Sequence, residues 1–191
     1  MKKLALFCSG SGSNAESLMS WFQDHPDIRV TLMVYNRKDS GAKMRADKFG
    51  VPAMYLPNAD FQGETGKASE ALNAFEIDFI LLAGFLALLP GWLVSRFRDR
   101  ILNIHPALLP DFGGKGMFGR NVHGAVKKSG ITETGMSIHL VNEKYDEGKI
   151  LFQATCPVWE SDSETDIATR VLKLEHLHYP LVAEQFILSK S

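Results

Sequence analysis

Short apolar runs alternate with amphipathic segments along the first half of the chain. The apolar runs are continuous rather than alternating, as expected of strands that are buried on both faces of a parallel sheet. The segments between them have the spacing of amphipathic helices, and this alternation is typical of a sheet with helices on both faces. In chain order the pattern reads KLALFC, SNAESLMSWFQ, IRVTLMVYN, SGAKMRADKFG, VPAMYLP, a polar helix near residues 64–75, and IDFILLAGF.

The pattern changes after residue 130. TGMSIHLVN and KILFQATCPV are strand-like runs joined by a short turn that contains Gly148, and residues 163–188 have helical periodicity. No repeat or linker divides the chain. We therefore expect a single α/β domain over residues 1–191. It would be a Rossmann-like, mostly parallel twisted sheet with helices on both faces, an antiparallel addition and a long helix at the C-terminal end.

The charge balance narrows the class of ligand. The chain has 21 Lys and Arg against 22 Asp and Glu, so it lacks the electrostatic footprint of a protein that binds nucleic acid or an anionic membrane. The apolar run near the N-terminus is broken by glycines after about six residues, and no run approaches the ~18 apolar residues of a membrane-spanning helix. Cys8 and Cys156 lack CxxC spacing, so we expect a cytoplasmic protein with reduced, buried thiols. A small molecule is the expected ligand.

A glycine-rich turn, SGSGSN at residues 9–14, directly follows the first predicted strand. Gly10 and Gly12 allow the backbone to approach a ligand, and the helix that follows directs free N–H groups at an anion. Ser13 and Glu16 also fit a capping box. The spacing matches neither the dinucleotide fingerprint nor the phosphate loop of nucleotide hydrolases. The sequence predicts a phosphate site here, and a plain strand-to-helix turn is the alternative.

The stretch LNIHP places two polar side chains at the end of an apolar strand. Ligands of open parallel sheets bind beyond the carboxyl ends of the strands, where Asn103 and His105 lie. With a period of two they point the same way, and Ile104 points to the other face. An amide and an imidazole together stabilise an oxyanion and move a proton, as acyl transfer requires. The alternative is a structural pair that satisfies nearby backbone groups.

Asp146 lies in YDEGKI, in a predicted turn before a strand. A carboxylate there would orient His105 and favour its charged form. An aspartate in a glycine-containing turn is also an ordinary turn former, so this signal alone is weak.

Five motifs together resemble the phosphoribosylglycinamide formyltransferase family, and they occur in that family's order from Leu4 to about Phe186. They are SGSGSN, LLAGFLALLP, LNIHPALLP, TGMSIHLVNEKYDEGKILFQ and RVLKLEHLHYP. The resemblance implies direct transfer of a formyl group from 10-formyltetrahydrofolate to the amine of N1-(5-phosphoribosyl)glycinamide through a tetrahedral intermediate. This is a step of de novo purine (IMP) biosynthesis. The N-terminal half would bind the ribonucleotide phosphate, and the C-terminal half would bind the folate.

The resemblance also implies a role for each matching residue. Asn103 would stabilise the oxyanion, His105 would be the general acid, and Asp146 would raise the pKa of that histidine. The implied ribonucleotide-binding residues are Gly12, Ser13, Asn14, Gly84 and Glu175. The implied folate-binding residues are Leu86, Ala87, Leu88, Leu89, Asn103 and Val141.

The chain departs from the family pattern in three places. Many members have an arginine where this chain has Ala87, and the helix around residues 61–72 also lacks an expected arginine. The loop at residues 111–121, DFGGKGMFGRN, is longer and richer in glycine than the family's turn. We expect it to be mobile without ligand and to lie over the crevice. Lys115 or Arg120 would approach an anionic group of a substrate, and Met117 or Phe118 would cover the pterin; a solvated connection is the alternative.

Other functions compete with this one. A methionyl-tRNA formyltransferase-like domain is disfavoured by the slightly acidic charge and by the chain's end at residue 191, and a formyltetrahydrofolate deformylase would need a regulatory domain before the shared fold. A non-catalytic nucleotide-binding module is the alternative from another class. His123, His176 and His178 have no metal-ligand spacing, so we expect no metal, while His139 either backs the active site or is a core histidine. The expected assembly is a monomer or a homodimer.

Overall fold

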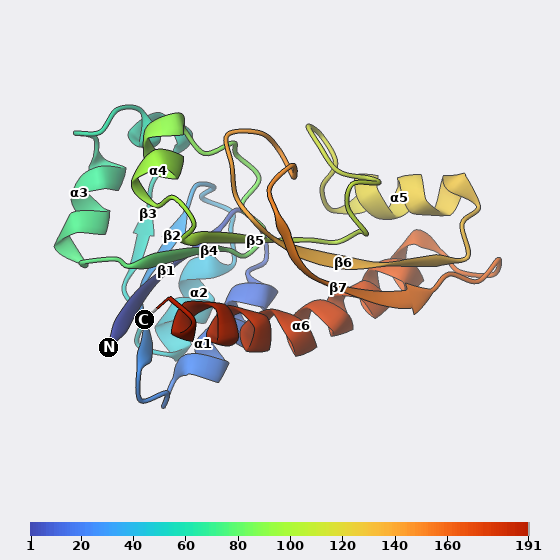
Figure 1. Cartoon of the computed structure of the whole chain (residues 1–191), viewed down its shortest axis with the longest axis horizontal. Coiled ribbons are helices and arrows are strands. Elements are labelled where there is room, and N and C mark those ends of the chain that lie inside the picture. Colours follow the sequence, from blue (N-terminus) through green and yellow to red (C-terminus); the bar gives the residue numbers. More distant parts are fainter. Residues whose placement is uncertain (191) are drawn as a thin grey trace.

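The computed structural model describes residues 1–190 and confirms the predicted α/β architecture (Figure 1). Within these residues seven strands form one sheet in the order β3-β2-β1-β4-β5-β6-β7. Strands β1 to β5 are parallel, whereas β6 pairs antiparallel with β5, and β7 pairs antiparallel with β6. The strands are β1 (Lys2–Cys8), β2 (Ile28–Tyr35), β3 (Ala53–Tyr55), β4 (Phe79–Leu82), β5 (Ile101–His105), β6 (Glu133–Leu140) and β7 (Ile150–Pro157).

Helices cover both faces of the sheet, as the alternating pattern predicted. Figure 1 shows α1, α2 and α6 on one face and α3 and α4 on the other. α5 follows the long loop and packs against α6. The helices are α1 (Ser13–Phe22), α2 (Ala42–Lys48), the 3₁₀ helix η1 (Asn58–Phe61), α3 (Lys67–Ala74), α4 (Gly91–Arg96), α5 (Arg120–Ser129) and α6 (Glu164–Leu188).

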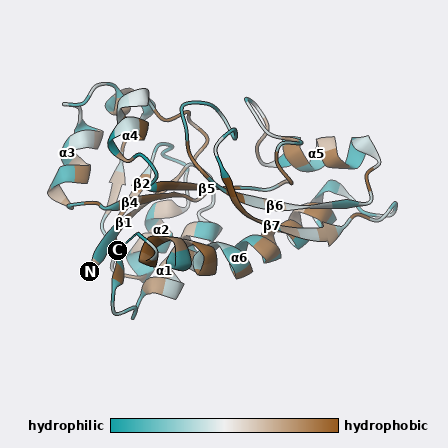
Figure 2. Ribbon diagram, in the orientation of Figure 1, coloured by the Kyte–Doolittle hydropathy of each residue, from teal (hydrophilic) through white to brown (hydrophobic). Residues whose placement is uncertain are grey.

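The core has two layers because successive strand residues face opposite sides of the sheet. In β1, Leu4 and Leu6 pack under α1 and α6, whereas Ala5 and Phe7 pack under α3 and α4. Figure 2 shows the central strands β4 and β5 as strongly hydrophobic and α6 as mixed. Fully burying such a side chain contributes about 1.5–3 kcal/mol, so both layers stabilise the sheet that carries the strand ends.

The predicted capping box at the start of α1 is wrong. The helix begins after Gly12, and its first turn has no side-chain cap. The Glu16 carboxylate instead pairs with Arg45 and Lys48 of α2. Because the N-cap is Gly12, Ser13 is already the first helical residue and cannot form the box, and the N–H of Glu16 donates to Gly12 O at 2.9 Å. The N-terminus of α1 is therefore left open.

Two helices were not predicted. α4 is only six residues long, too short for a clear period. α5 begins at Arg120, so the loop ends at residue 119 and not at 121. The spacing of the buried Val122 and Val126, and the left-handed Gly130 that ends the helix, were the available signals. The predicted polar helix near residues 64–75 is α3, and it starts at Lys67.

Both cysteines are free and buried, as expected. No helix within residues 1–190 is long and apolar enough to cross a membrane.

Candidate active site

A cavity of about 620 Å³ opens where β1, β4 and β5 end. The chain leaves β1 for β2 on one side, and β4 lies on the other side, so the connections diverge between β1 and β4. A crevice at such a divergence is where ligands of open α/β sheets bind. The cavity is lined by Gly10–Asn14, Ala83–Leu86, Asn103–Pro106, Gly114–Gly119, His123, Tyr145, Asp146, Ala168, Val171, Leu172 and Glu175.

The glycine-rich turn forms one wall. Gly12 has φ 79°, a left-handed conformation that favours glycine, and it starts α1 without a side-chain cap. Among residues 1–190, the backbone N–H groups of Ser11, Ser13 and Asn14 have no hydrogen-bond partner, whereas the N–H of Gly12 faces the Cys8 thiol. Three free amides at the positive end of a helix form a site for an anion.

The turn after β4 is tied to the end of β1. The backbone N–H of Ser9 donates to Gly84 O at 2.9 Å, and Ser9 Oγ accepts from the N–H of Leu86 at 2.9 Å. Gly84 has φ 80°, so a side chain would be strained there. Sequence reasoning missed Ser9, which links the two predicted binding segments.

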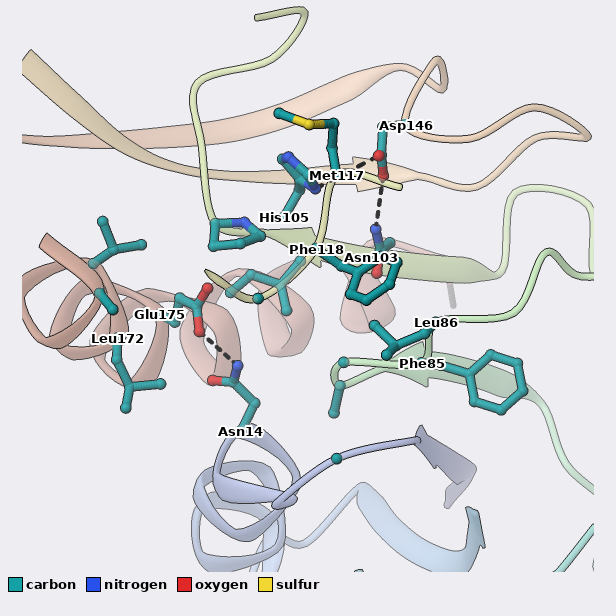
Figure 3. Close-up of a pocket in the computed structure, with 18 of the residues that line it drawn as sticks. Asn14, Phe85, Leu86, Asn103, His105, Met117, Phe118, Asp146, Leu172 and Glu175 are labelled. Carbon is teal, nitrogen blue, oxygen red and sulfur yellow. Dashed lines mark hydrogen bonds and ion pairs between the residues drawn. The ribbon is translucent and has the colours of Figure 1, made fainter. Parts of the chain in front are cut away.

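Asn103, His105 and Asp146 meet at the end of β5 (Figure 3). Asp146 places one carboxylate oxygen 3.4 Å from Asn103 Nδ2 and the other 3.5 Å from His105 Nδ1. Asp146 lies in a turn at φ 56°, which a short polar side chain tolerates. The Ile104 side chain packs into the core instead. The structure thus brings the three predicted catalytic residues together.

His139 supports this group from β6, where it pairs with Asn103 in register. His139 Nδ1 lies 2.9 Å from the backbone carbonyl of Leu140, within hydrogen-bond distance, and His139 Nε2 lies 3.0 Å from Asn103 Nδ2. His139 Nε2 is also 3.6 Å from the Asp146 carboxylate. Of the two interpretations of His139, the one that backs the site agrees with these contacts.

The environment of His105 favours the neutral form. Burial lowers the pKa of His105 below its ordinary value, while Asp146 and the carbonyl of Phe112 act in the opposite direction. Nε2 donates to Phe112 O at 2.8 Å. Asp146 therefore favours the imidazolium, as the resemblance implied, but desolvation outweighs it.

The charge of Asp146 is maintained by its neighbours. Burial by itself would raise the pKa of Asp146, but His139, His105 and the N–H of Gly114 together hold that pKa below its usual range. Gly114 N donates to the carboxylate at 3.0 Å. The loop that begins after β5 is thereby attached to the catalytic group.

Glu175 lies opposite, on α6, and accepts from Asn14 Nδ2 at 2.7 Å (Figure 3). It is only 6% exposed, and burial raises the pKa of Glu175 to about 7, against the opposing effect of the Asn14 amide. The buried Asn14 Oδ1 has no partner among residues 1–190. A buried acid beside an unpaired amide oxygen is suited to hydrogen bonding with a polar ligand.

The structure places only part of the predicted folate-binding segment at the cavity. Leu86 lines the cavity, but Ala87, Leu88, Leu89 and Val141 are not in its wall. Leu89 is buried in the core layer under α4, whereas Leu88 is 47% exposed.

Some lining residues were missed by sequence reasoning. Ala168, Val171 and Leu172 precede Glu175 at helical spacing, and that spacing was the signal that would have found them. Met117 and Phe118 line the cavity, as does Lys115, whereas Arg120 does not. Residues 1–190 contain no group of three or more His, Cys, Asp or Glu side chains that would hold a metal.

Comparison with known proteins agrees with this geometry. Residues 2–183 match the model of the formyl transferase family. The chloroplastic phosphoribosylglycinamide formyltransferase of Arabidopsis thaliana is 44% identical over 183 residues, which cover 93% of this chain and 63% of that relative. The phosphoribosylglycinamide formyltransferase of Bacillus subtilis is 32% identical over 191 residues, which cover 98% of this chain and 95% of that relative.

Solved structures give the same result. The phosphoribosylglycinamide formyltransferase of Bacillus halodurans superposes with a TM-score of 0.88 at 27% identity and covers 100% of this chain and 97% of that one. Glycinamide ribonucleotide transformylase 1 of Symbiobacterium toebii has a TM-score of 0.86 at 32% identity, covering 96% of this chain and 86% of that one. From its sequence, its sheet and the residues at the end of β5, the chain belongs to the formyl transferase family.

Proposed function

We propose that this protein transfers a formyl group from 10-formyltetrahydrofolate to the amine of N1-(5-phosphoribosyl)glycinamide, in purine biosynthesis. The observation that carries the proposal is the meeting of Asn103, His105 and Asp146 in one cavity with the open N-terminus of α1. One side of that cavity suits an anion, and the other suits acyl chemistry.

In this proposal the ribonucleotide phosphate binds the backbone amides of Gly12, Ser13 and Asn14. Glu175 forms hydrogen bonds with the polar part of the same substrate. Because its pKa is near the working pH, its carboxyl group can either donate or accept them. Gly84 has no side chain to occupy the space beside the ligand. Its left-handed backbone would strain any other residue at this position. The glycinamide amine then points toward His105.

The folate is proposed to enter beside Leu86 and Phe118, which line the same cavity as Asn103 (Figure 3). Both side chains line the cavity and offer apolar surface to a pterin. Ala87, Leu88, Leu89 and Val141 remain proposed folate contacts, acting through backbone groups or after movement of the turn, because their side chains lie outside the cavity wall.

The chemistry proceeds by direct acyl transfer. The amine nitrogen attacks the formyl carbon, and the carbonyl oxygen takes up the negative charge as the new C–N bond forms. Asn103 Nδ2 donates a hydrogen bond to that oxygen. His105 accepts the proton that the amine loses and returns it to N10 of the folate as the old C–N bond breaks; because Nδ1 faces Asp146, this step requires Nε2 to leave the Phe112 carbonyl and meet the substrate. No proton is gained or lost overall.

Asp146 and His139 act behind these groups. Asp146 stabilises His105 while it is an imidazolium, and this stabilisation offsets part of the burial. Both hydrogens of the Asn103 amide have a neighbour, His139 Nε2 at 3.0 Å and Asp146 Oδ1 at 3.4 Å, and the hydrogen with the longer contact is the one proposed to turn to the oxyanion when substrate binds.

We further propose that residues 1–191 act as one domain, that the enzyme is cytoplasmic and needs no metal, and that it works as a monomer or a homodimer. The proposed reaction uses small molecules only, with no nucleic acid.

An absorbance assay of folate product release tests the function. With 10-formyltetrahydrofolate supplied, product release should depend on glycinamide ribonucleotide. Equal release without that acceptor would indicate a deformylase, and release with methionyl-tRNA alone would indicate the tRNA enzyme. A protein that binds nucleotide but no folate by calorimetry would be a nucleotide-binding module.

A further inference from the structure

The glycine-rich turn is held from behind by the segment that starts α2. Gly10 O accepts from the N–H of Gly41 at 3.1 Å and from Ser40 Oγ at 2.8 Å. Ser11 O accepts from Arg45 Nε at 2.7 Å. Ser40, Gly41 and Arg45 do not belong to the cavity wall, so they act on the turn and not on a ligand inside the cavity.

These contacts set the direction of the free amides. In a planar trans peptide the C=O and the following N–H point in opposite directions. Turning the carbonyls of Gly10 and Ser11 toward α2 therefore turns the N–H groups of Ser11 and Gly12 away from α2; both residues line the cavity, and the Gly12 N–H is shared with the Cys8 thiol. The ability of the turn to bind an anion depends on what holds its carbonyls.

Arg45 also corrects an electrostatic conflict. Glu16 lies in the first turn of α1, where its charge would repel an anion bound at the same helix end. Arg45 Nη1 pairs with one Glu16 oxygen, and Lys48 Nζ lies 3.0 Å from the other. The Arg45 and Glu16 side chains are 21% and 28% exposed, so solvent screens this pair only in part. The three charges together sum to +1.

We propose that Arg45 is a positioning residue for the phosphate of the substrate. It fixes the Ser11 carbonyl and offsets Glu16, without contacting the ligand. The identity of the phosphate compound rests on the proposed function, whereas the anion site itself does not.

The test compares ligands with and without a phosphate. Ribose 5-phosphate and ribose are titrated into the labelled protein while the amide signals of Gly12 and Ser13 are followed by NMR. Glycinamide ribonucleotide and its dephosphorylated ribonucleoside are compared by calorimetry. Arg45→Met should weaken both phosphorylated ligands about 10-fold, as expected for loss of a hydrogen bond to a charged group, and change ribonucleoside affinity less than twofold. The affinity of Arg45→Lys, which keeps the charge, for the phosphorylated ligands should lie between those of the parent and Arg45→Met.

A second variant tests the turn without changing charge. A Cβ at Gly41 would lie 2.5 Å from Ser11 O, so Gly41→Ala must displace that carbonyl and should also weaken ribose 5-phosphate. Arg37→Met is the matched control, because Arg37 is exposed and its ion pair within residues 1–190 is with Asp39. Circular dichroism checks that each variant is folded.

Three results would overturn the inference. They are parent-like ribose 5-phosphate affinity in Arg45→Met and Gly41→Ala, equal losses for the ribonucleotide and the ribonucleoside, and no shift of the Gly12 and Ser13 amides in the parent. Failure of the proposed function looks different, because the parent would then bind ribose 5-phosphate but transfer no formyl group.

Discussion

At the scale of single residues, the arrangement around His105 determines what the site can do. Its imidazole is 4% exposed and lies between two acceptors, Phe112 O on Nε2 and Asp146 on Nδ1. Burial favours the neutral form, and the acceptors stabilise a transient charge. A group with these opposing influences is suited to accept and return a proton near neutral pH.

His105→Ala should lower kcat roughly 100-fold or more, the usual loss for a general acid–base group, and leave the Kd of both substrates unchanged. Steady-state kinetics and calorimetry check this. His178→Ala is a suitable control, since His178 stacks on Phe152 and lies outside the cavity wall. Near-normal turnover in a folded His105→Ala protein would remove this role.

Asn103→Ala should lower kcat by about 100- to 1,000-fold, the loss seen when one oxyanion donor is removed. Substrate binding should change little, because the donor acts mainly on charge that develops in the transition state. The measurement is kcat with the Kd of a folate analogue. A larger loss of binding than of kcat would contradict the oxyanion role.

Asp146→Asn should change the pH dependence as well as the rate. Removing the carboxylate leaves only the Phe112 carbonyl to oppose burial, so the pKa of His105 falls further. If the base form of His105 is active, the acidic limb of the kcat profile moves to lower pH. A profile that keeps the parent's shape would show that the two residues are not coupled.

At the scale of elements, the loop at residues 111–119 connects the catalytic group to α5. It is attached at two points, through Phe112 O to His105 and through Gly114 N to Asp146. Gly114, Gly116 and Gly119 all have positive φ, where other residues would be strained. The same loop carries Phe118, which is 44% exposed at the cavity.

We expect amide hydrogen exchange across residues 111–119 to slow when the ribonucleotide and a folate analogue are both bound. Lys115→Ala should raise KM more than it lowers kcat, because Lys115 lines the cavity and its positive charge would attract an anionic group of a substrate. Arg120→Ala is the internal control, since Arg120 lies outside the cavity wall. Unchanged exchange together with a parent-like KM for Lys115→Ala would make the loop a solvated connection.

At the scale of the whole molecule, the buried Glu175 links stability to pH. Its folded pKa is about 7, above the ordinary value of 4.5, so the folded state holds a proton that the unfolded state loses. This contribution to stability is fully present below about pH 4.5 and is lost as the pH rises to about 7.

Glu175→Gln should remove this decrease of stability with rising pH. The Gln amide still accepts from Asn14, and the difference in unfolding free energy between variant and parent should grow from pH 4.5 to 7 by on the order of 3 kcal/mol at most. Chemical denaturation across that range measures it, and taking the difference cancels the opposite slope from the buried histidines. A difference that is constant with pH would contradict the raised pKa.

Much of the fold was predictable from local pattern, because burial on both faces demands continuous apolar strands and burial on one face demands amphipathic helices. The end of β5 was predictable too, since a period of two places Asn103 and His105 on one side. Short elements such as α4 escaped because six residues are less than two turns.

What the sequence by itself determined is the alternation of elements, the glycine-rich turn and the polar pair that ends a buried strand. Only the tertiary structure decided the partners. Asp146 reaches Asn103 across 43 residues, and Glu175 reaches Asn14 across 161. The tertiary structure also pairs Glu16 with Arg45 and buries Leu89 in the core. Local periodicity indicates which face of a helix or strand a side chain lies on. Contacts between distant segments depend instead on the order of the strands in the sheet and on which possible partner lowers the free energy of the side chain most.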